Sequence, residues 1–203
     1  MSVGGQSGAT FRDLEFKIAH GQDRDAALQL RRDVCARDWP AVPLDRVVDS
    51  ADTTAVQLVA CTSDGQIIAS LRVVPWSQRP FDLERFTSLG MLLPSDRRPA
   101  EIGRFCVAAG NRYVRRGAFV HLGMLKLAFE LARKMEISDY LMTAVTRYSG
   151  LYRFGGFRET GICFDHPEWG QVDLMRIDLS NMESLRPSIR RMLESPQSNI
   201  FVD

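Results

Sequence analysis

The clearest candidate for acid-base chemistry is a tyrosine in the segment 151–157, Leu-Tyr-Arg-Phe-Gly-Gly-Phe. Tyr152 stands four residues before Gly156, which can end a helix because glycine readily adopts positive φ. We therefore expect Tyr152 on a short helix, between a strand and a second extended stretch. A phenol held on such an element can donate a proton to a leaving thiolate. The alternative interpretation is an ordinary aromatic residue of an amphipathic helix.

Two opposite charges occur within a second segment, 101–107, which reads Glu-Ile-Gly-Arg-Phe-Cys-Val. In a strand, Glu101 and Gly103 share one face and Arg104 lies on the other. Burying such charges is costly unless they are paired. We interpret Glu101 as a carboxylate that accepts a proton from an amine nucleophile or orients it, with Gly103 letting a ligand approach the backbone. A structural ion pair on an edge strand is the alternative.

A basic turn at 111–117 follows this strand, before the long helix that we expect at 118–135. Backbone N–H groups at the start of a helix bind phosphate well, and arginine side chains strengthen such a site. A solvated surface turn is the alternative interpretation. The candidate phosphate-binding residues are Arg112, Arg115, Arg116 and Gly117.

The remaining elements follow from hydrophobic periodicity and turn residues. Asp23 is a plausible N-cap, and Trp39-Pro40 ends the helix that follows it. Asp64-Gly65 predicts a hairpin. Segment 75–99, which contains four prolines, is the least regular region and suits a specificity-determining insertion, with a short helix at 82–89. The expected strands are 11–19, 56–61, 67–74, 101–108, 140–146, 158–164 and 172–179, and the other expected helices are 23–38, 118–135 and 182–194.

This order of elements predicts an α/β (α+β) fold with one mixed sheet. We expect a flexible leader at 1–9, a single domain at 10–195 and a tail at 196–203. The net charge of +1 gives no global field that calls for nucleic acid or an anionic membrane. The longest apolar region, 119–132, is too short and too charged to cross a membrane.

The four cysteines are widely spaced and form no CxxC pair. This pattern argues against a zinc site or a disulfide framework, so we expect no metal. Reduced, mostly buried thiols are typical of a cytoplasmic protein. His121 falls within the apolar arc of the long helix, which favours a core histidine over a catalytic base.

Taken together, the strand at 101–108, the basic turn, the long helix, the strand at 140–146 and segment 151–157 resemble the GCN5-related N-acetyltransferase superfamily. The resemblance implies a central sheet splayed between the strands near 101–108 and 140–146, with helices on both faces. The pantetheine arm of an acyl thioester then lies in the opening. The family's turn normally reads Arg/Gln-x-x-Gly-x-Gly/Ala, whereas Arg112-x-x-Arg115-x-Gly117 lacks the first glycine.

A narrower resemblance involves the acyl-homoserine-lactone synthases and the related long-chain N-acyl amino acid synthases. Residues 101–105 are similar to their Glu-x-Ser-Arg-Phe signature, with glycine in place of serine. Cys35 stands where those families usually have an aromatic residue. These departures favour the amino acid synthases over enzymes that use S-adenosylmethionine. The other matching residues are Leu30, Arg31, Val34, Trp39, Asp49, Asp52 and Arg72.

The resemblance also implies roles for individual residues. Glu101 would help to deprotonate the acceptor amine, Tyr152 would protonate the departing sulfur, and Arg104 would hold an acceptor carboxylate. The donor carbonyl would lie near Phe105, Cys106 and Val107, and the arginines of the turn with Gly117 would meet the donor's phosphate. The implied substrate-binding residues are Arg31, Trp39, Arg72, Trp76 and Phe81, the last two as walls of an acyl pocket.

The sequence thus predicts an enzyme, an N-acyltransferase that moves an acyl group, expected to be long-chain, from acyl carrier protein to the amine of an amino acid or similar small molecule. A carrier protein offers phosphopantetheine without the nucleotide of coenzyme A, which suits a turn that has lost a glycine. Two alternatives stay open: an N-acetyltransferase that uses acetyl-CoA or another acyl-CoA to acylate a small amine or a protein, and a catalytically inactive acyl-binding or regulatory module. A monomer and a homodimer are both compatible with the sequence.

Overall fold

One sheet of eight strands, in the order β6-β7-β5-β4-β3-β2-β1-β8, organises the computed structural model, which describes residues 13–112, 114–196 and 199–202. The side chains of residues 114–116 also lie outside the described part. The mixed sheet that we expected is therefore confirmed. Its strands are β1 (Leu14–Ile18), β2 (Val56–Thr62), β3 (Ile67–Val74), β4 (Pro99–Val107), β5 (Asp139–Val145), β6 (Arg158–His166), β7 (Gly170–Asp178) and β8 (Ile200–Phe201).

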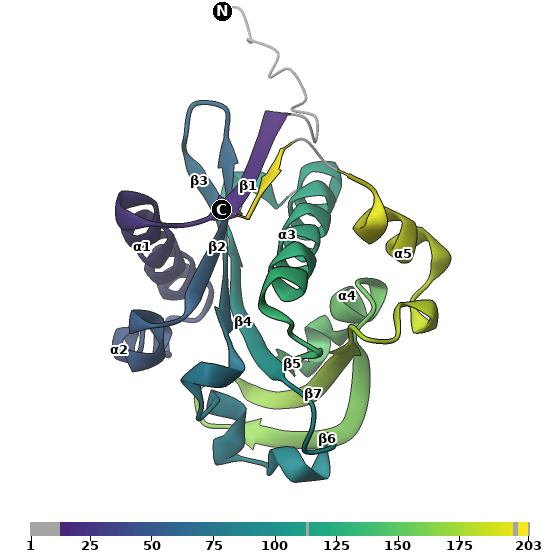
Figure 1. Ribbon diagram of the computed structural model, residues 1–203. Helices are drawn as coiled ribbons and strands as arrows, with labels where there is room; N and C mark the ends of the chain where they lie inside the picture. The colour runs from purple at the N-terminus through teal and green to yellow at the C-terminus, as the bar shows by residue number, and fades with distance from the viewer. Residues whose placement is uncertain (1–12, 113, 197–198, 203) are drawn as a thin grey trace, which may run out of the picture.

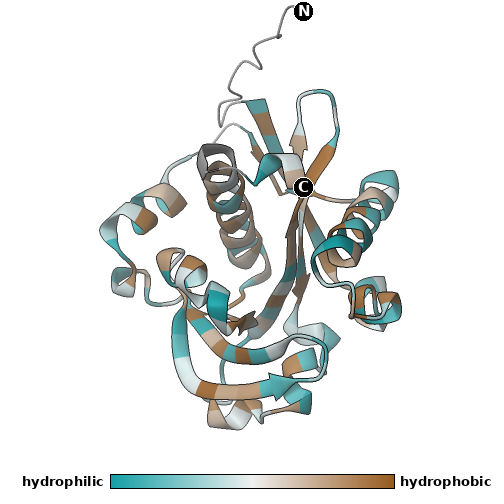
Figure 2. Ribbon diagram, turned by 180° about the vertical axis from the view of Figure 1, so that it is seen from behind, coloured by the Kyte–Doolittle hydropathy of each residue, from teal (hydrophilic) through white to brown (hydrophobic). Residues whose placement is uncertain are grey.

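Helices cover both faces of the sheet (Figure 1). One face carries α1 (Gly21–Asp38) and α2 (Leu44–Val47), and the other carries α3 (Val114–Met135), α4 (Ser149–Phe154) and α5 (Pro187–Glu194). The main core lies between α3 and the sheet, where Figure 2 shows hydrophobic residues on the inner side of both. A Cβ at Gly123 would lie 2.1 Å from the ring of Phe16, so glycine is what allows α3 to approach β1 this closely.

The sheet opens between its two central strands. Strands β4 and β5 are parallel and are connected through α3, as parallel strands require. Their pairing covers only Pro99–Glu101 against Asp139–Leu141, although β4 continues to Val107 and β5 to Val145. The two strands therefore diverge after Glu101, as we expected.

A β-bulge interrupts β4 at the same place. Ser70 of β3 pairs with Cys106, but Arg72 pairs with Gly103. Between these two pairs the chain of β4 advances by three residues, whereas that of β3 advances by two. Arg104 has a φ of 56°, which is costly for a residue that carries a Cβ. Such a bulge bends the strand and re-aims its side chains.

Several boundaries differ from those expected. Helix α1 begins at Gly21 with His20 as N-cap, so Asp23 lies in the first turn, where its carboxylate suits the helix dipole and pairs with Lys17 at 2.8 Å. Helix α3 begins at Val114, which makes the basic turn shorter and places Gly117 inside the helix. A Cβ at Gly117 would lie 2.7 Å from the carbonyl oxygen of Arg112, which explains the glycine.

Two expected helices are also shorter or divided. Residues 82–89 form 3₁₀ turns at Asp82–Arg85 and Leu89–Met91 instead of one helix. The expected helix 182–194 is a 3₁₀ turn, Met182–Ser184, followed by α5, whose first residue is Pro187. Within the expected tail, Ile200–Phe201 forms β8 and pairs with β1 in parallel.

The expected leader, 1–9, lies outside the described residues. In the part of the chain that the structure describes, no helix has the length and apolar character needed to cross a membrane.

Candidate functional site

A cleft of about 170 Å³ lies where β4 and β5 diverge. Its walls are Ile102–Cys106 of β4 and Thr143–Val145 of β5, the segments of the two strands that have left the shared ladder. Helices α1 and α4 close it on either side. Of the expected site residues, the cleft brings together Arg31, Trp39, Arg72, Glu101, Arg104, Phe105, Cys106 and Tyr152.

Tyr152 lies on α4 and faces the cleft. Gly155 ends the helix, and Gly156 has a φ of 103°, the positive value that we expected there. Among the described residues, no hydrogen-bond partner is found for the Tyr152 hydroxyl. Burial raises the pKa of Tyr152 to about 12. The phenol therefore keeps its proton at neutral pH and can donate it into the cleft.

A small apolar pocket of about 30 Å³ lies on the α3 side of the opening. It shares Ile102, Phe105 and Tyr152 with the cleft, so the two spaces adjoin through the gap between the strands. His121 lies in its wall, 6.2 Å from the ring of Tyr152. Burial lowers the pKa of His121 to about 4, so the imidazole is neutral at pH 7, as suits a histidine of the core. The other lining residues are Leu71, Met124, Leu125, Met142 and Phe157.

Glu101 is buried at the point where the strands separate. Its Oε2 accepts a hydrogen bond from the backbone N–H of Asp82 at 2.8 Å, and its Oε1 accepts one from Leu83 at 3.1 Å. Burial raises the pKa of Glu101, although these N–H groups oppose the shift. The carboxylate therefore anchors segment 75–99 to the sheet while it also lines the cleft.

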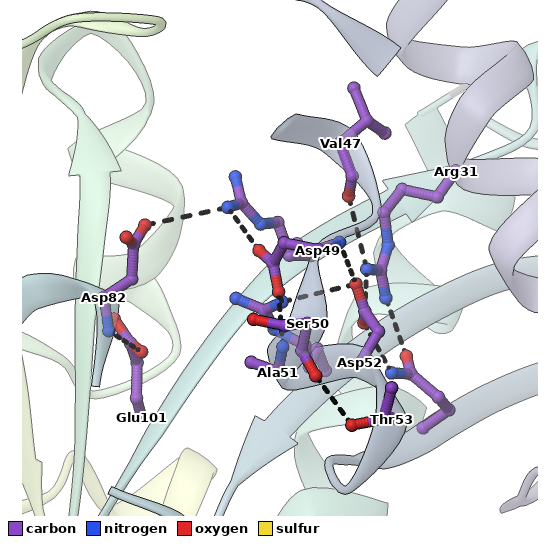
Figure 3. Close-up of polar contacts among 12 residues, drawn as sticks. Arg31, Val47, Asp49, Ser50, Ala51, Asp52, Thr53, Asp82 and Glu101 are labelled. Carbon is purple, nitrogen blue, oxygen red and sulfur yellow. Dashed lines mark hydrogen bonds and ion pairs between the residues drawn. The ribbon is translucent and has the colours of Figure 1, made fainter. Parts of the chain in front are cut away.

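Three arginines from three elements converge on two aspartates of the segment that precedes β2 (Figure 3). Arg31 of α1 contacts Asp52 at 2.7 Å, and Arg72 of β3 contacts Asp49 at 2.8 Å and Asp52 at 3.4 Å. Arg104 of the bulge contacts Asp49 at 3.2 Å. The spacing of Asp49 and Asp52 forms a capping box at the 3₁₀ turn Ser50–Thr53, which explains why both carboxylates face the arginines.

The three arginines differ in what they can still bind. Arg31 is fully buried, and its guanidinium is used by Asp52 and by the side-chain oxygen of Gln57 at 2.6 Å. Arg31 therefore positions the segment at 49–52, although its side chain borders the cleft. Burial favours the neutral form of Asp52, but Arg31 and Arg72 outweigh this effect and hold the pKa of Asp52 below its usual value. Arg104 remains the more accessible cation, with 14% of its side chain exposed.

A second pocket, of about 360 Å³, adjoins the cleft on the side of Arg104. It shares Arg72, Asp82, Arg104 and Trp169 with the cleft. Its walls carry both charges, since Asp82 lies 3.6 Å from Arg104, and His166 contacts Glu168 at 2.9 Å. Such a surface suits a zwitterion.

Sequence reasoning did not identify three residues of this second pocket: Asp82, His166 and Trp169. They come from segment 75–99 and from the β6–β7 hairpin, which meet only in the folded chain. Trp169 also packs edge-on against Trp39 with 5.4 Å between the ring centroids. The one signal in the sequence that could have pointed to them is the occurrence of an aromatic residue next to ionisable residues within the turn of this hairpin.

The other expected residues lie around these pockets. Phe81 is buried in the wall of the second pocket. Trp76 lies outside both pockets, where it packs on Arg79 and on Phe81.

The residues that we expected on the side of the acyl donor lie at the end of β4 and in the segment after it. The carbonyl oxygen of Val107 accepts a hydrogen bond from the Nε of Arg112 at 2.7 Å. Arg115 and Arg116 belong to the first turn of α3, and their side chains lie outside the described part. Within that part, no cluster of three or more His, Cys, Asp and Glu side chains is placed to hold a metal ion.

A scan against protein-family models finds no match, and neither does a search of curated protein sequences. Solved structures do match. FeeM, an N-acyl amino acid synthase from uncultured soil microbes, is similar with a TM-score of 0.71 at 11% identity, over 87% of this chain and 97% of FeeM. BjaI, a CoA-dependent acyl-homoserine lactone synthase solved with SAM and isopentyl-CoA, gives a TM-score of 0.69 at 18% identity, over 94% of this chain and 93% of BjaI.

A GCN5-related N-acetyltransferase from Kribbella flavida gives a TM-score of 0.55 at 18% identity, over 83% of this chain and 99% of that protein. At identities this low, the likeness is one of fold. The chain therefore has the fold of the GCN5-related N-acetyltransferases and of the acyl-homoserine lactone and N-acyl amino acid synthases, as its sequence motifs predict.

Proposed function

We propose that this protein is an N-acyltransferase that moves an acyl group from a carrier thioester to the amine of an amino acid or a similar small molecule. One observation carries the proposal: the sheet opens between β4 and β5, and a protonated phenol, Tyr152, borders the opening. The solved structures with this fold include enzymes described as N-acyl amino acid and acyl-homoserine lactone synthases, which supports the same reaction class.

The donor arm is proposed to lie along β4. Beyond Glu101, the edge of β4 that faces β5 has no ladder partner among the described residues. Such an edge can hydrogen-bond to an extended amide-containing chain, as a sheet edge binds an added strand. A backbone N–H between Phe105 and Val107, re-aimed by the bulge at Arg104, then polarises the thioester carbonyl and stabilises the tetrahedral oxyanion.

The acceptor is proposed to enter from the second pocket. Arg104 binds its carboxylate, and its amine meets the carbonyl at the shared boundary of the two spaces. Glu101 takes the proton from the ammonium group, directly or through water, and its raised pKa suits that role. The amine attacks the carbonyl carbon, the carbon–sulfur bond breaks, and Tyr152 protonates the departing thiolate.

The acyl chain is proposed to occupy the apolar pocket on the α3 side. At about 30 Å³ this pocket accepts a short chain as it stands. A long chain requires Met124 and Met142 to change rotamer, which methionine does readily. The small volume is the observation that favours the second candidate function, a coenzyme A-dependent N-acetyltransferase. A series of acyl donors of increasing length separates the two, because an acetyltransferase loses activity as soon as the chain is extended.

The donor is proposed to be an acylated carrier protein, which presents phosphopantetheine on an acidic surface. The start of α3, with Arg115, Arg116 and Gly117 in its first turn, follows β4 closely and offers backbone N–H groups to a phosphate. Acyl-CoA is the alternative donor. Both donors are found inside cells, which is consistent with a cytoplasmic enzyme.

The Tyr152→Phe variant tests this assignment. It removes the proton donor and leaves the ring in place, so we expect the turnover number to fall by at least about tenfold with little change in donor affinity. Wild-type turnover should rise with pH as the acceptor amine deprotonates. Because the pKa of Tyr152 is about 12, the phenol keeps its proton, and turnover should show no decline at any pH up to about 10.

Tyr148→Phe is the matched control, because Tyr148 also borders the cleft but is 46% exposed. A loss of turnover confined to Tyr148→Phe would assign the acid to that residue instead. Donor binding without turnover in the wild-type protein, unchanged by Tyr152→Phe and Glu101→Gln, would show an inactive acyl-binding module.

A further inference from the structure

Two cysteine side chains meet on the floor of the cleft. Cys35 of α1 and Cys106 of β4 are both buried and both line the cleft. The two side chains lie close enough that each is the largest influence on the pKa of the other. They share an apolar cluster with Val34, Val42 and Val47.

The contact makes the two thiols unequal. The neighbouring Cys106 thiol lowers the pKa of Cys35, with a further contribution from the guanidinium of Arg104, although burial opposes the shift. The Cys35 side chain and burial raise the pKa of Cys106 well above its usual value. Cys35 is therefore the more acidic of the two thiols, which is the division of roles in a pair of attacking and resolving cysteines.

We propose that Cys35 and Cys106 form an oxidation site in which a hydroperoxide entering the cleft oxidises Cys35 and Cys106 closes a disulfide with it. In the first step, the Cys35 thiolate attacks the peroxide oxygen, the O–O bond breaks, and Cys35 becomes a sulfenic acid while the peroxide is reduced to water or an alcohol. In the second step, the Cys106 sulfur displaces the sulfenic oxygen, which leaves as water, and the S–S bond forms.

The disulfide would lie in the donor cleft. It joins α1 to β4 between Arg31, one turn before Cys35, and the bulge at Arg104. Under the proposed function, this cross-link occupies the place where the thioester carbonyl approaches β4, so the oxidised enzyme cannot bind its donor productively. The oxidation itself does not depend on that function, because it requires only the two thiols and access for a small oxidant.

The chain supplies its own control in Cys61, a buried cysteine outside the cleft. Burial raises the pKa of Cys61 to about 11. Because Cys35 is the more acidic thiol and borders the cleft, it should react much faster than Cys61. Cys163 is exposed and is replaced by serine in every protein tested, which prevents disulfides between molecules.

The test is hydrogen peroxide treatment of the full chain carrying Cys163→Ser, followed by alkylation under denaturing conditions and non-reducing peptide mass spectrometry. We expect a peptide pair linking Cys35 to Cys106, two hydrogen atoms lighter than the reduced pair, with Cys61 fully alkylated. With Cys106→Ser added, oxidation should stop at a sulfenic acid on Cys35 that dimedone traps. With Cys61→Ser added instead, the link should form as before.

The result that overturns the proposal is recovery of Cys35 and Cys106 in the reduced form under peroxide conditions that oxidise Cys163 in the unsubstituted chain. Reaction of Cys61 at the rate of Cys35 would overturn it equally, because general unfolding and not the cleft would then control access. If the link forms, donor turnover is measured before and after reduction with dithiothreitol. A reversible loss shows the regulatory consequence, whereas absent turnover in the reduced protein counts against the proposed function and leaves the disulfide established.

Discussion

At the scale of single residues, burial sets the protonation state of Tyr152 and His121, two ionisable side chains beside the opening. It raises the pKa of Tyr152 to about 12 and lowers that of His121 to about 4. Both groups are therefore neutral at pH 7, one a proton donor toward the cleft and the other part of an apolar wall. His121 also differs from its unfolded state, where a histidine has a pKa near 6.5.

This difference predicts acid sensitivity. The unfolded chain binds a proton at residue 121 first as the pH falls, so the free energy of unfolding should drop between about pH 6.5 and pH 4, by about 2 kcal/mol at pH 5. His121→Leu should remove this part of the pH dependence in urea titrations at pH 7 and pH 5. His20→Ala, which removes an exposed histidine, is the control, and a wild-type slope in His121→Leu would contradict the argument.

At the scale of elements, the buried ion pairs hold segment 49–52 against α1 and the sheet. Arg31→Ala leaves the buried Asp52 carboxylate with its neutral hydrogen-bond donors and, among the described residues, with Arg72 at 3.4 Å as its remaining cationic partner, so we expect a loss of about 3–5 kcal/mol in the free energy of unfolding. Arg37→Ala, on the same helix but exposed, should change it by less than about 1 kcal/mol. Urea denaturation measures both.

A double variant separates the charge from the packing. Arg31→Met combined with Asp52→Asn removes both charges of this buried pair. The double variant should therefore lose less stability than the sum of the losses in the two single variants. Strict additivity of the two losses would show that the ion pair is not what holds the segment.

The elements also show what could be predicted from the sequence. The hairpin at Asp64-Gly65, the helix carrying Tyr152 and the positive φ of Gly156 just past its end follow from local backbone preferences, and the structure has all three. Local preference does not reveal β8, because a two-residue strand is stabilised only by its partner β1.

The candidate site, too, could be predicted from the sequence only in part. The motif residues on β4, α1 and β3 meet as the resemblance implies, since their spacing is tied to regular elements. The second pocket was missed, and Trp76 lies outside both pockets, because the path of segment 75–99 depends on tertiary contacts such as those of Glu101 with the backbone of Asp82 and Leu83.

At the scale of the whole molecule, exposed apolar side chains gather around α4, the helix that borders the cleft through Tyr152. Tyr148, Leu151 and Phe154 are 46%, 46% and 49% exposed around α4, and Arg153 lies among them. Arg147 stacks on Trp39 and on Tyr148. Exposed apolar side chains interspersed with arginines suit an acidic protein partner better than a small anion, although the net charge of the chain is only +1.

The type of donor can therefore be identified by removing positive charges from the start of α3. If the donor is an acidic carrier protein, Arg115→Ala combined with Arg116→Ala should raise its KM roughly tenfold at low ionic strength, and salt should shrink the effect because dissolved ions screen attraction between charged proteins. Arg133→Ala, an exposed arginine at the opposite end of the same helix, is the control and should leave KM unchanged. Acyl-CoA, tested in parallel, meets the helix start through its phosphates alone, so its KM should change less. An equal change for both donors would indicate a phosphate site without a protein docking surface, and no change for either would mean that the start of α3 takes no part in donor binding.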